Sequence, residues 1–128
     1  MLIGELASKA NVSVDTIRYY QREGLVVPEF VRESGYREFN AQAVETLRFI
    51  VRAKDLGFSL KQIRTLLQLT HNPDTRCGEV RALAEDKLAE INAKIAALEG
   101  MKEELTTLLS ECSDQSASVT QCPIVESL

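Results

Sequence analysis

The sequence predicts a mainly α-helical protein, in which a winged helix-turn-helix unit precedes a long antiparallel coiled-coil helix and a short cysteine-bearing loop. Three observations predict this fold: two short amphipathic helix patterns joined by a tight turn, an apolar repeat of about 3.5 residues in the second half, and cysteines at positions 77, 112 and 122. We expect residues 1–76 to form the winged domain with a second helix pair. Residues 77–111 should form the dimerisation helix, and 112–128 the loop with a short terminal helix.

The N-terminal residues have the pattern of a helix-turn-helix. A helix over residues 3–10 keeps its apolar side chains on one face, and Ser13 is a suitable N-cap for a second helix over residues 14–23, with Gly24 just past its end. In such a pair the second helix enters the major groove, where hydroxyl, guanidinium and aromatic groups contact phosphates and bases. The alternative is a purely structural helix pair. The groups of this kind on the second helix belong to Thr16, Arg18, Tyr19 and Tyr20.

Residues 30–39 predict a short hairpin, because strand-forming residues flank a Glu-Ser-Gly turn. Beside a helix-turn-helix this hairpin is a wing, in which Arg32 and Arg37 would contact phosphates and Tyr36 would add a hydroxyl. Each could equally be a solvated side chain or one that covers the core. The predicted DNA contacts are therefore Ser13, Val14, Thr16, Arg18, Tyr19, Tyr20, Arg32, Tyr36 and Arg37.

A second helix pair should follow the wing. Asn40 is a suitable cap for a helix to about Leu56, Ser59 for the next helix, and the proline-containing loop over residues 70–76 is the natural domain boundary. This loop holds the only histidine, His71, which is more often solvated in such a position than bound to a metal. The residues expected to face inward are Val44, Leu47, Ile50, Val51, Lys54, Leu60, Ile63, Leu66 and Leu67.

Charge is divided unevenly along the chain. Residues 1–76 carry 11 Lys or Arg and 9 Asp or Glu, a net charge of +2, whereas residues 77–128 carry 4 and 10, a net charge of −6. This division is compatible with a nucleic-acid reader joined to an acidic dimerisation or effector segment. No apolar run approaches the roughly 20 residues that span a bilayer, and no signal peptide is evident, so we expect a cytoplasmic protein without a membrane partner.

The second half predicts one long helix with an apolar seam. Successive seam positions alternate by four and three residues, the spacing of a coiled coil, and only Lys102 interrupts them. The seam calls for a partner helix and hence a homodimer, although an amphipathic helix that docks on its own domain is the alternative. The seam residues are Ala84, Leu88, Ile91, Ile95, Leu98, Lys102, Leu105 and Leu109.

The three cysteines fit such a dimer. Cys77 and Cys112 bracket a helix that would be roughly 50 Å long at about 1.5 Å per residue, whereas Cys112 and Cys122 can meet across a Ser-rich loop. An antiparallel partner would bring its Cys77 to that loop, which predicts two thiolate sites per dimer. The alternatives are buried structural cysteines, a thiol redox sensor, and an enzyme, for which His71 has no evident catalytic partner.

The chain resembles the MerR family of bacterial transcription regulators over essentially its whole length. The resemblance implies a winged helix-turn-helix domain, a long antiparallel dimerisation helix and a C-terminal effector loop. It also implies binding to double-stranded promoter DNA whose elements are too widely spaced, distortion of that DNA when the effector binds, and recruitment of RNA polymerase. It rests on Ile3-Gly4-Glu5-Leu6-Ala7, Thr16-Ile17-Arg18-Tyr19-Tyr20, Gly35-Tyr36-Arg37, Leu56-Gly57-Phe58-Ser59 and Cys122-Pro123-Ile124-Val125.

Within the family the C-terminal residues resemble the metal-sensing branch, which implies that Cys112 and Cys122 hold an ion. Copper, silver and gold sensors typically have serine where this chain has Cys77, so the resemblance implies a divalent sensor in which Cys77 is a third ligand across the dimer. Three thiolates suit Hg²⁺, Cd²⁺ or Pb²⁺, whereas Zn²⁺ generally takes a fourth ligand, for which the loop offers only Asp114. A monovalent metal sensor and a redox-sensing regulator remain the alternatives.

Overall fold

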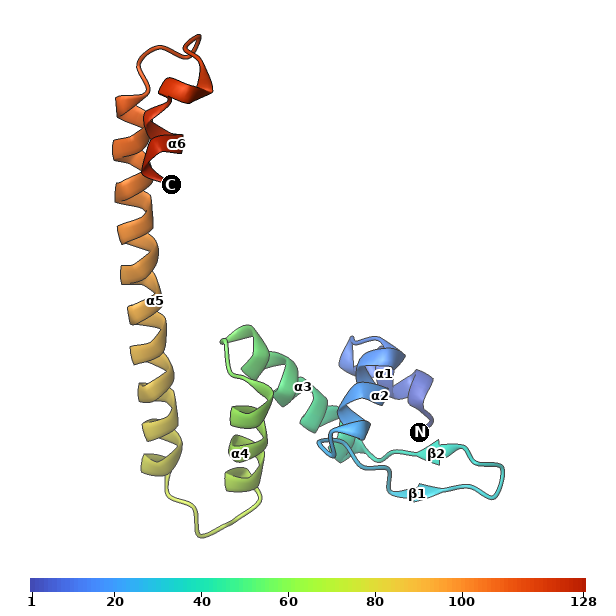
Figure 1. The fold of residues 1–128 in the computed structure, drawn as a ribbon. Helices are drawn as coiled ribbons and strands as arrows, with labels where there is room; N and C mark the ends of the chain where they lie inside the picture. The colour runs from blue at the N-terminus through green and yellow to red at the C-terminus, as the bar shows by residue number, and fades with distance from the viewer. The chain divides into compact units, whose positions relative to one another are not determined.

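The structure is a computed structural model that describes residues 1–128 and divides into two units, Met1–Val80 and Arg81–Leu128. The first unit opens with α1 (Ile3–Ala10) and α2 (Val14–Arg22), joined by a turn in which Asn11 has a left-handed backbone with φ of 56° (Figure 1). The Ser13 hydroxyl caps α2 by accepting a hydrogen bond of 3.0 Å from the Thr16 N–H. The predicted helix-turn-helix is confirmed.

The wing consists of β1 (Phe30–Val31) and β2 (Arg37–Glu38), which pair antiparallel with Phe30 opposite Glu38. Gly35 lies at the tip with φ of 89°, a backbone conformation that strains residues with a Cβ. The turn is closed by the Gly35 N–H, which donates to the Arg32 carbonyl at 2.8 Å. The predicted hairpin is confirmed, with shorter strands than the ten-residue pattern would allow.

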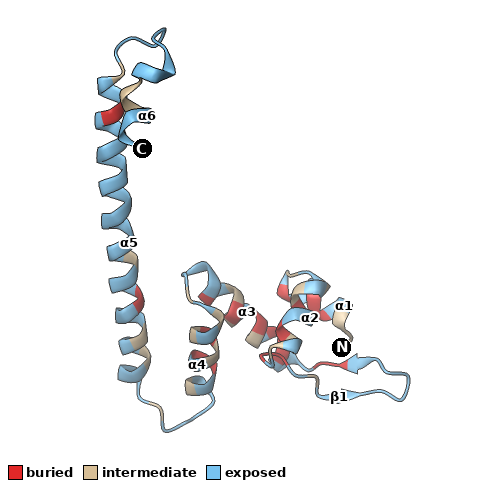
Figure 2. Ribbon diagram, in the orientation of Figure 1, coloured by how far each residue is buried: buried red, intermediate tan, exposed pale blue.

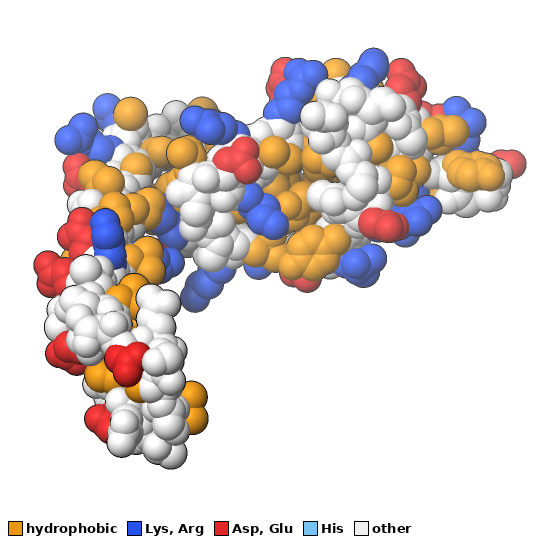
Figure 3. Space-filling view, turned by 90° about the horizontal axis from the view of Figure 1, so that it is seen from above, with side chains coloured by type: hydrophobic (Ala, Val, Ile, Leu, Met, Phe, Trp, Pro, Cys, Tyr) orange, Lys and Arg blue, Asp and Glu red, His pale blue; other side chains and the backbone are white.

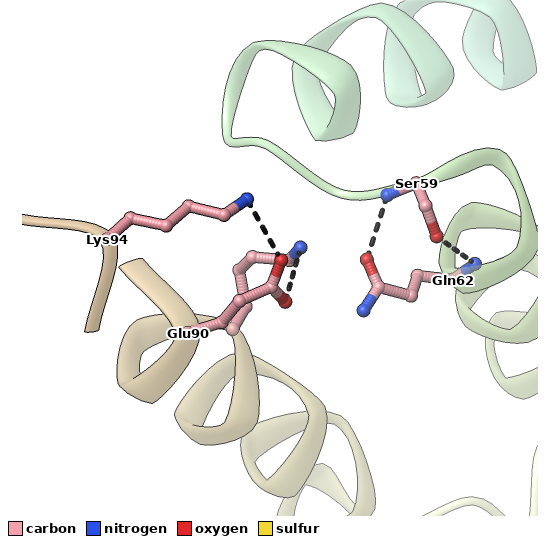
Figure 4. A network of polar contacts seen from close by, with 5 residues as sticks. Ser59, Gln62, Glu90 and Lys94 are labelled. Atoms are coloured by element: carbon pink, nitrogen blue, oxygen red, sulfur yellow. Dashed lines mark hydrogen bonds and ion pairs between the residues drawn. The ribbon is translucent and has the colours of Figure 1, made fainter. Parts of the chain in front are cut away.

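The second helix pair consists of α3 (Ala41–Asp55) and α4 (Leu60–Thr70), each capped as predicted. Asn40 accepts from the Ala43 N–H, and Ser59 with Gln62 forms a reciprocal capping box with hydrogen bonds of 2.8 and 3.2 Å (Figure 4). One core prediction is wrong: Lys54 is exposed, because Ala53 occupies the buried position beside it.

A single apolar core holds the first unit together. Its fully buried side chains come from α1, α2, the strand-to-helix junction, α3 and α4, and Figure 2 shows them as the red segments of these elements. Removing water from these side chains stabilises the unit, and α2 is thereby fixed against the other helices. The largest fully buried side chains are Phe39, Leu6, Ile17, Leu47, Ile50 and Ile63.

The second unit contains most of α5 (Cys77–Glu111), then η1 (Val119–Gln121) and α6 (Pro123–Ser127). Along α5 the seam residues Leu88, Ile95 and Leu98 are exposed, and Leu108 is the one buried apolar residue of this unit. Figure 2 accordingly shows α5 mostly in pale blue. In the space-filling view of Figure 3, hydrophobic side chains lie at the surface of the molecule among acidic and basic ones. The predicted long helix is confirmed.

None of the helices has the length and hydropathy of a membrane span.

Candidate functional site

A hollow of about 310 Å³ lies between α2 and the wing. Arg18 and Arg22 reach it from α2, and Tyr36 and Arg37 reach it from the wing. Three guanidinium groups and a phenol that converge from two elements form a surface suited to phosphate oxygens. The structure thus brings together three residues predicted from the sequence and adds Arg22. That arginine follows Arg18 by four positions and so shares its helix face, a signal that was available in the sequence.

The other predicted α2 residues divide between surface and core. Tyr19 is 41% exposed, and the Arg22 guanidinium lies 5.9 Å from its ring centroid, within cation–π range. Tyr20 is only 3% exposed and belongs to the core, so the prediction that it offers an aromatic face to DNA is wrong. The reason is helical period: Tyr20 follows the fully buried Ile17 by three residues and shares its inward face.

The start of α2 is shaped by its cap. The Ser13 and Thr16 hydroxyls lie 2.7 Å apart at the helix N-terminus, where the helix dipole favours anions. Val14 is partly buried and packs against the core, so its side chain supports the helix more than it faces outward. Arg18, exposed on the same helix, lies 3.6 Å from the Asp15 carboxylate, a surface contact that a phosphate can displace.

Arg32 has a partner that the sequence did not reveal. Its guanidinium pairs with the Glu38 carboxylate across the wing, and the other oxygen of that carboxylate lies 3.0 Å from the Met1 ammonium. Hydrogen bonds from that ammonium and from Arg32 hold the pKa of Glu38 below its ordinary value, against the opposing effect of desolvation. Glu38 is 8% exposed, so one buried carboxylate lies between two cationic groups.

Cys112 and Cys122 line one hollow of about 240 Å³ at the end of α5. Cys112 directly follows α5, and Cys122 precedes α6, where its carbonyl accepts from the Glu126 N–H at 3.0 Å. Both thiols are free and partly buried. Two thiols on one hollow are the donors that soft metal ions prefer, so this pair fits the predicted metal ligands.

Asp114 lines the same hollow. One of its carboxylate oxygens accepts from the Ser116 N–H at 3.1 Å and from the Ser116 hydroxyl at 2.6 Å. These hydrogen bonds hold the pKa of Asp114 below its ordinary value. The carboxylate therefore supplies negative charge beside the two thiols, while one of its oxygens organises the loop.

Cys77 is not part of this hollow. It is exposed at the first position of α5, and the continuous 35-residue helix places it about 50 Å from Cys112 at about 1.5 Å per residue. His71 is exposed at the C-cap of α4. Within the chain no group of three His, Cys, Asp or Glu side chains is placed to hold a metal. A third thiolate on the Cys112–Cys122 pair would have to come from a second copy.

Comparison with known proteins concerns both the arginine-lined hollow of the first unit and the cysteine-lined hollow of the second. Residues 1–70 match the family model described as MerR HTH family regulatory protein, and residues 44–108 match one described as MerR, DNA binding. The chain is 40% identical over 128 residues to heavy metal-dependent transcription regulator 2 of Rhizobium meliloti, covering 100% of this chain and 86% of the relative. It is 36% identical over 126 residues to the mercuric resistance operon regulatory protein of Bacillus cereus, covering 98% and 95%.

Among solved structures the chain is similar to the transcription regulator PbrR691 from Ralstonia metallidurans, which was crystallised in complex with lead(II). The TM-score is 0.90 and the sequence identity 35%, and the alignment covers 99% of this chain and 98% of the other. The likeness includes the second unit as well as the first, so these proteins share the long helix and the C-terminal loop.

Proposed function

The chain belongs to the MerR family of transcription regulators, and from this premise we propose that it is a homodimeric activator of heavy-metal resistance genes whose effector is a soft divalent ion. Members of this family are DNA-binding regulators and not enzymes. One observation carries the proposal: Cys112 and Cys122 line a single hollow at the far end of the helix that begins with Cys77.

The first unit binds promoter DNA in this proposal. The Ser13 end of α2 enters the major groove, and Arg18, Arg22 and Arg37 neutralise phosphates along the hollow between α2 and the wing. Tyr19, Arg32 and Tyr36 are exposed and complete this surface. RNA polymerase then acts on the promoter that the dimer has distorted.

The second unit binds the effector and the second copy. Exposed seam residues of α5 pack against the seam of an antiparallel partner, because apolar side chains at this spacing are those that pack between the helices of a coiled coil. Cys77 of the partner subunit then joins Cys112 and Cys122. Three thiolates suit Hg²⁺, Cd²⁺ or Pb²⁺, and Zn²⁺ fits less well because its usual fourth ligand would have to come from Asp114 or water.

Effector binding is coupled to transcription through the arrangement of the two DNA-binding units. An ion that binds one arrangement more tightly shifts the population toward it, by no more than the difference in binding free energy. Operator affinity and transcriptional activation are therefore separable readouts, and loss of a thiol should reduce activation more than affinity.

Two other effectors are distinguished by their chemistry. A monovalent copper, silver or gold ion would need only Cys112 and Cys122 and would leave Cys77 without a role. A thiol redox sensor would respond to peroxide by disulfide formation or sulfenic acid, without a metal. The divalent ion is favoured by the relatives named as a heavy metal-dependent regulator and as a mercuric resistance operon regulator, and by the similar structure with lead(II).

The test is transcription from the cognate promoter in vitro, with DNA binding measured in parallel. Cd²⁺, Hg²⁺ or Pb²⁺ should activate the wild-type protein and produce thiolate-to-metal charge-transfer absorbance. Cys122→Ser should abolish both the activation and the absorbance but should retain operator binding. Cys77→Ser should lose activation by divalent ions but should retain operator binding. Full activation of Cys77→Ser by divalent ions would support a site made of Cys112 and Cys122 alone, the type expected for monovalent ions. Activation by peroxide in the presence of a chelator would support the redox sensor.

A further inference from the structure

Glu38 is an acidic residue in a surface that is proposed to bind DNA, which is itself negatively charged. It lies on β2 next to Arg37, in the wing of a unit that is proposed to bind phosphates. A carboxylate near DNA raises the local negative potential and so opposes binding. Glu38 is nevertheless 8% exposed and ionised, with its pKa held below the ordinary value by hydrogen bonds from the Met1 ammonium and Arg32.

Each oxygen of the Glu38 carboxylate contacts a different cationic group. Its Oε1 pairs with the Arg32 guanidinium, and its Oε2 accepts from the Met1 ammonium at 3.0 Å. The Arg32 backbone is fixed as well, since its N–H donates to the Tyr36 carbonyl at 2.7 Å and its carbonyl accepts from the Gly35 N–H. Arg32 is thus held at the backbone by the turn and at the guanidinium by Glu38.

The Arg32 side chain is still 52% exposed, while the Glu38 side chain is 11% exposed. A guanidinium has five N–H donors in a planar fork, and one carboxylate oxygen leaves several of them facing solvent. The pair therefore buries the acid and exposes the base. An arginine that is already ordered loses less rotamer entropy when it contacts a phosphate.

We propose that Glu38 is a positioning residue for DNA binding, which orders the Arg32 guanidinium toward the phosphate backbone and so strengthens binding despite its negative charge. This inference rests on the proposed DNA-binding function of the wing. It makes a prediction opposite in sign to that of simple electrostatics, because removing an acid from a DNA-binding surface would otherwise tighten binding.

The experiment compares Glu38→Gln with Glu33→Gln in the full-length protein, with cognate promoter DNA as the probe. Glu33 is exposed in the same wing and has no ion pair, so it reports the effect of charge alone. Glu33→Gln should leave affinity unchanged or tighten it. Glu38→Gln should weaken binding by roughly three- to tenfold, the range for the net contribution of one hydrogen bond. Arg32→Ala should flatten the plot of log affinity against log salt by about 0.9, and the slope for Glu38→Gln should shift toward that of Arg32→Ala.

A double-mutant cycle separates positioning from a general loss of wing structure. In the Arg32→Ala background, Glu38→Gln should no longer weaken binding and should act like Glu33→Gln, because the residue through which it works is gone. Undiminished weakening in that background, or binding by Glu38→Gln as tight as by Glu33→Gln, would overturn the proposal. Thermal unfolding of each variant shows whether the unit remains folded under the binding conditions.

The same measurements distinguish failure of the underlying function. If the wild-type chain does not bind promoter DNA at all, the regulator proposal fails. If it binds but Arg32→Ala changes neither affinity nor salt slope, Arg32 makes no phosphate contact and the positioning role of Glu38 is refuted while the regulator proposal stands.

Discussion

At the residue scale, the proposed DNA-contacting surface depends on arginines that reach one hollow from two elements. Arg18 extends from α2 and Arg37 from the wing. Arg22 lines the same hollow, and its guanidinium lies 5.9 Å from the Tyr19 ring centroid. Exposed guanidinium groups contribute to affinity mainly by releasing counterions from DNA. Their number should therefore appear directly in the salt dependence of binding.

Arg18→Ala and Arg37→Ala should each weaken promoter binding and flatten the plot of log affinity against log salt by about 0.9, the value for one lost phosphate contact. Arg81→Ala is the matched control, because Arg81 pairs with Glu85 on α5, outside the hollow. It removes the same charge and should leave the slope unchanged. Fluorescence anisotropy at several salt concentrations makes the measurement, and unaltered slopes for both variants would refute the assigned contacts.

Residues whose role is local could be predicted from the sequence, whereas residues whose role depends on a distant partner could not. Ser13, Asn40 and Ser59 were recognisable as caps because a cap bonds to a backbone N–H only two or three residues away. Glu38 gave no such signal, since its partner Arg32, which directly follows β1, comes close to it only once the wing has folded. Tyr20 was misassigned because aromatic residues suit both DNA surfaces and cores.

Acid should destabilise the first unit in part through Glu38. Its pKa is lower in the folded protein than its ordinary value of 4.5, so its contribution is fully present above that value and is lost as the pH falls through the lower, folded pKa. Thermal unfolding between about pH 6 and pH 3 should show a steeper loss of stability for the wild type than for Glu38→Gln. Parallel curves would indicate that the ion pairs of Glu38 contribute nothing to folding.

At the element scale, the caps define where the helices of the first unit begin. The Ser59–Gln62 capping box satisfies N–H groups at the start of α4, whose Ile63 is fully buried. Ser59→Ala should lower the free energy of unfolding by about 1 kcal/mol, and Ser8→Ala, on the exposed side of α1, by less than about 0.5 kcal/mol. Denaturant unfolding measures both, and equal stabilities would show that water replaces the cap without cost.

The helix α5 differs from the others because most of its apolar side chains are exposed. Leu108 is its one buried apolar residue. Its extent was predictable, since a helix of this length has a long periodic pattern between a proline loop and a Ser-rich loop. A partner helix that would cover the seam belongs to a second chain, and the structure of one chain does not include it. Dimerisation therefore stays a prediction of the seam pattern.

Ile95→Glu should yield monomers, because it would bury an unpaired charge in the seam between two helices. Ala93→Glu adds the same charge on the opposite face of α5, where both residues next to it are exposed, and should remain dimeric. Sedimentation velocity distinguishes the two states. Dimers of Ile95→Glu, or monomers of both variants, would show that the interface lies elsewhere on the chain.

At the scale of the whole molecule, the proposed thiol site needs Cys112 and Cys122 of one chain and Cys77 of the partner subunit. The closing of the loop between Cys112 and Cys122 followed from their short separation in sequence, and both do line one hollow. Cys77 as the third ligand stays a prediction, which rests on its place at the other end of a 35-residue helix. The identity of the ion depends on ligand number and distances in the assembled dimer, which the sequence of one chain does not encode locally.

Mixing Cys77→Ser chains with Cys112→Ser chains tests this assembly directly. In the heterodimer one site would keep Cys112 and Cys122 of one chain with Cys77 of the partner subunit, and the other site would lack two thiols. Each parental homodimer would be defective at both sites. The mixture should therefore recover one divalent site per heterodimer, measured as thiolate-to-metal absorbance on titration with Cd²⁺ or Hg²⁺, while neither parent alone does. If Cys77 served its own chain, both heterodimer sites would lack a ligand, and the absorbance would stay at the parental level, because a three-thiolate site needs all its donors in one place.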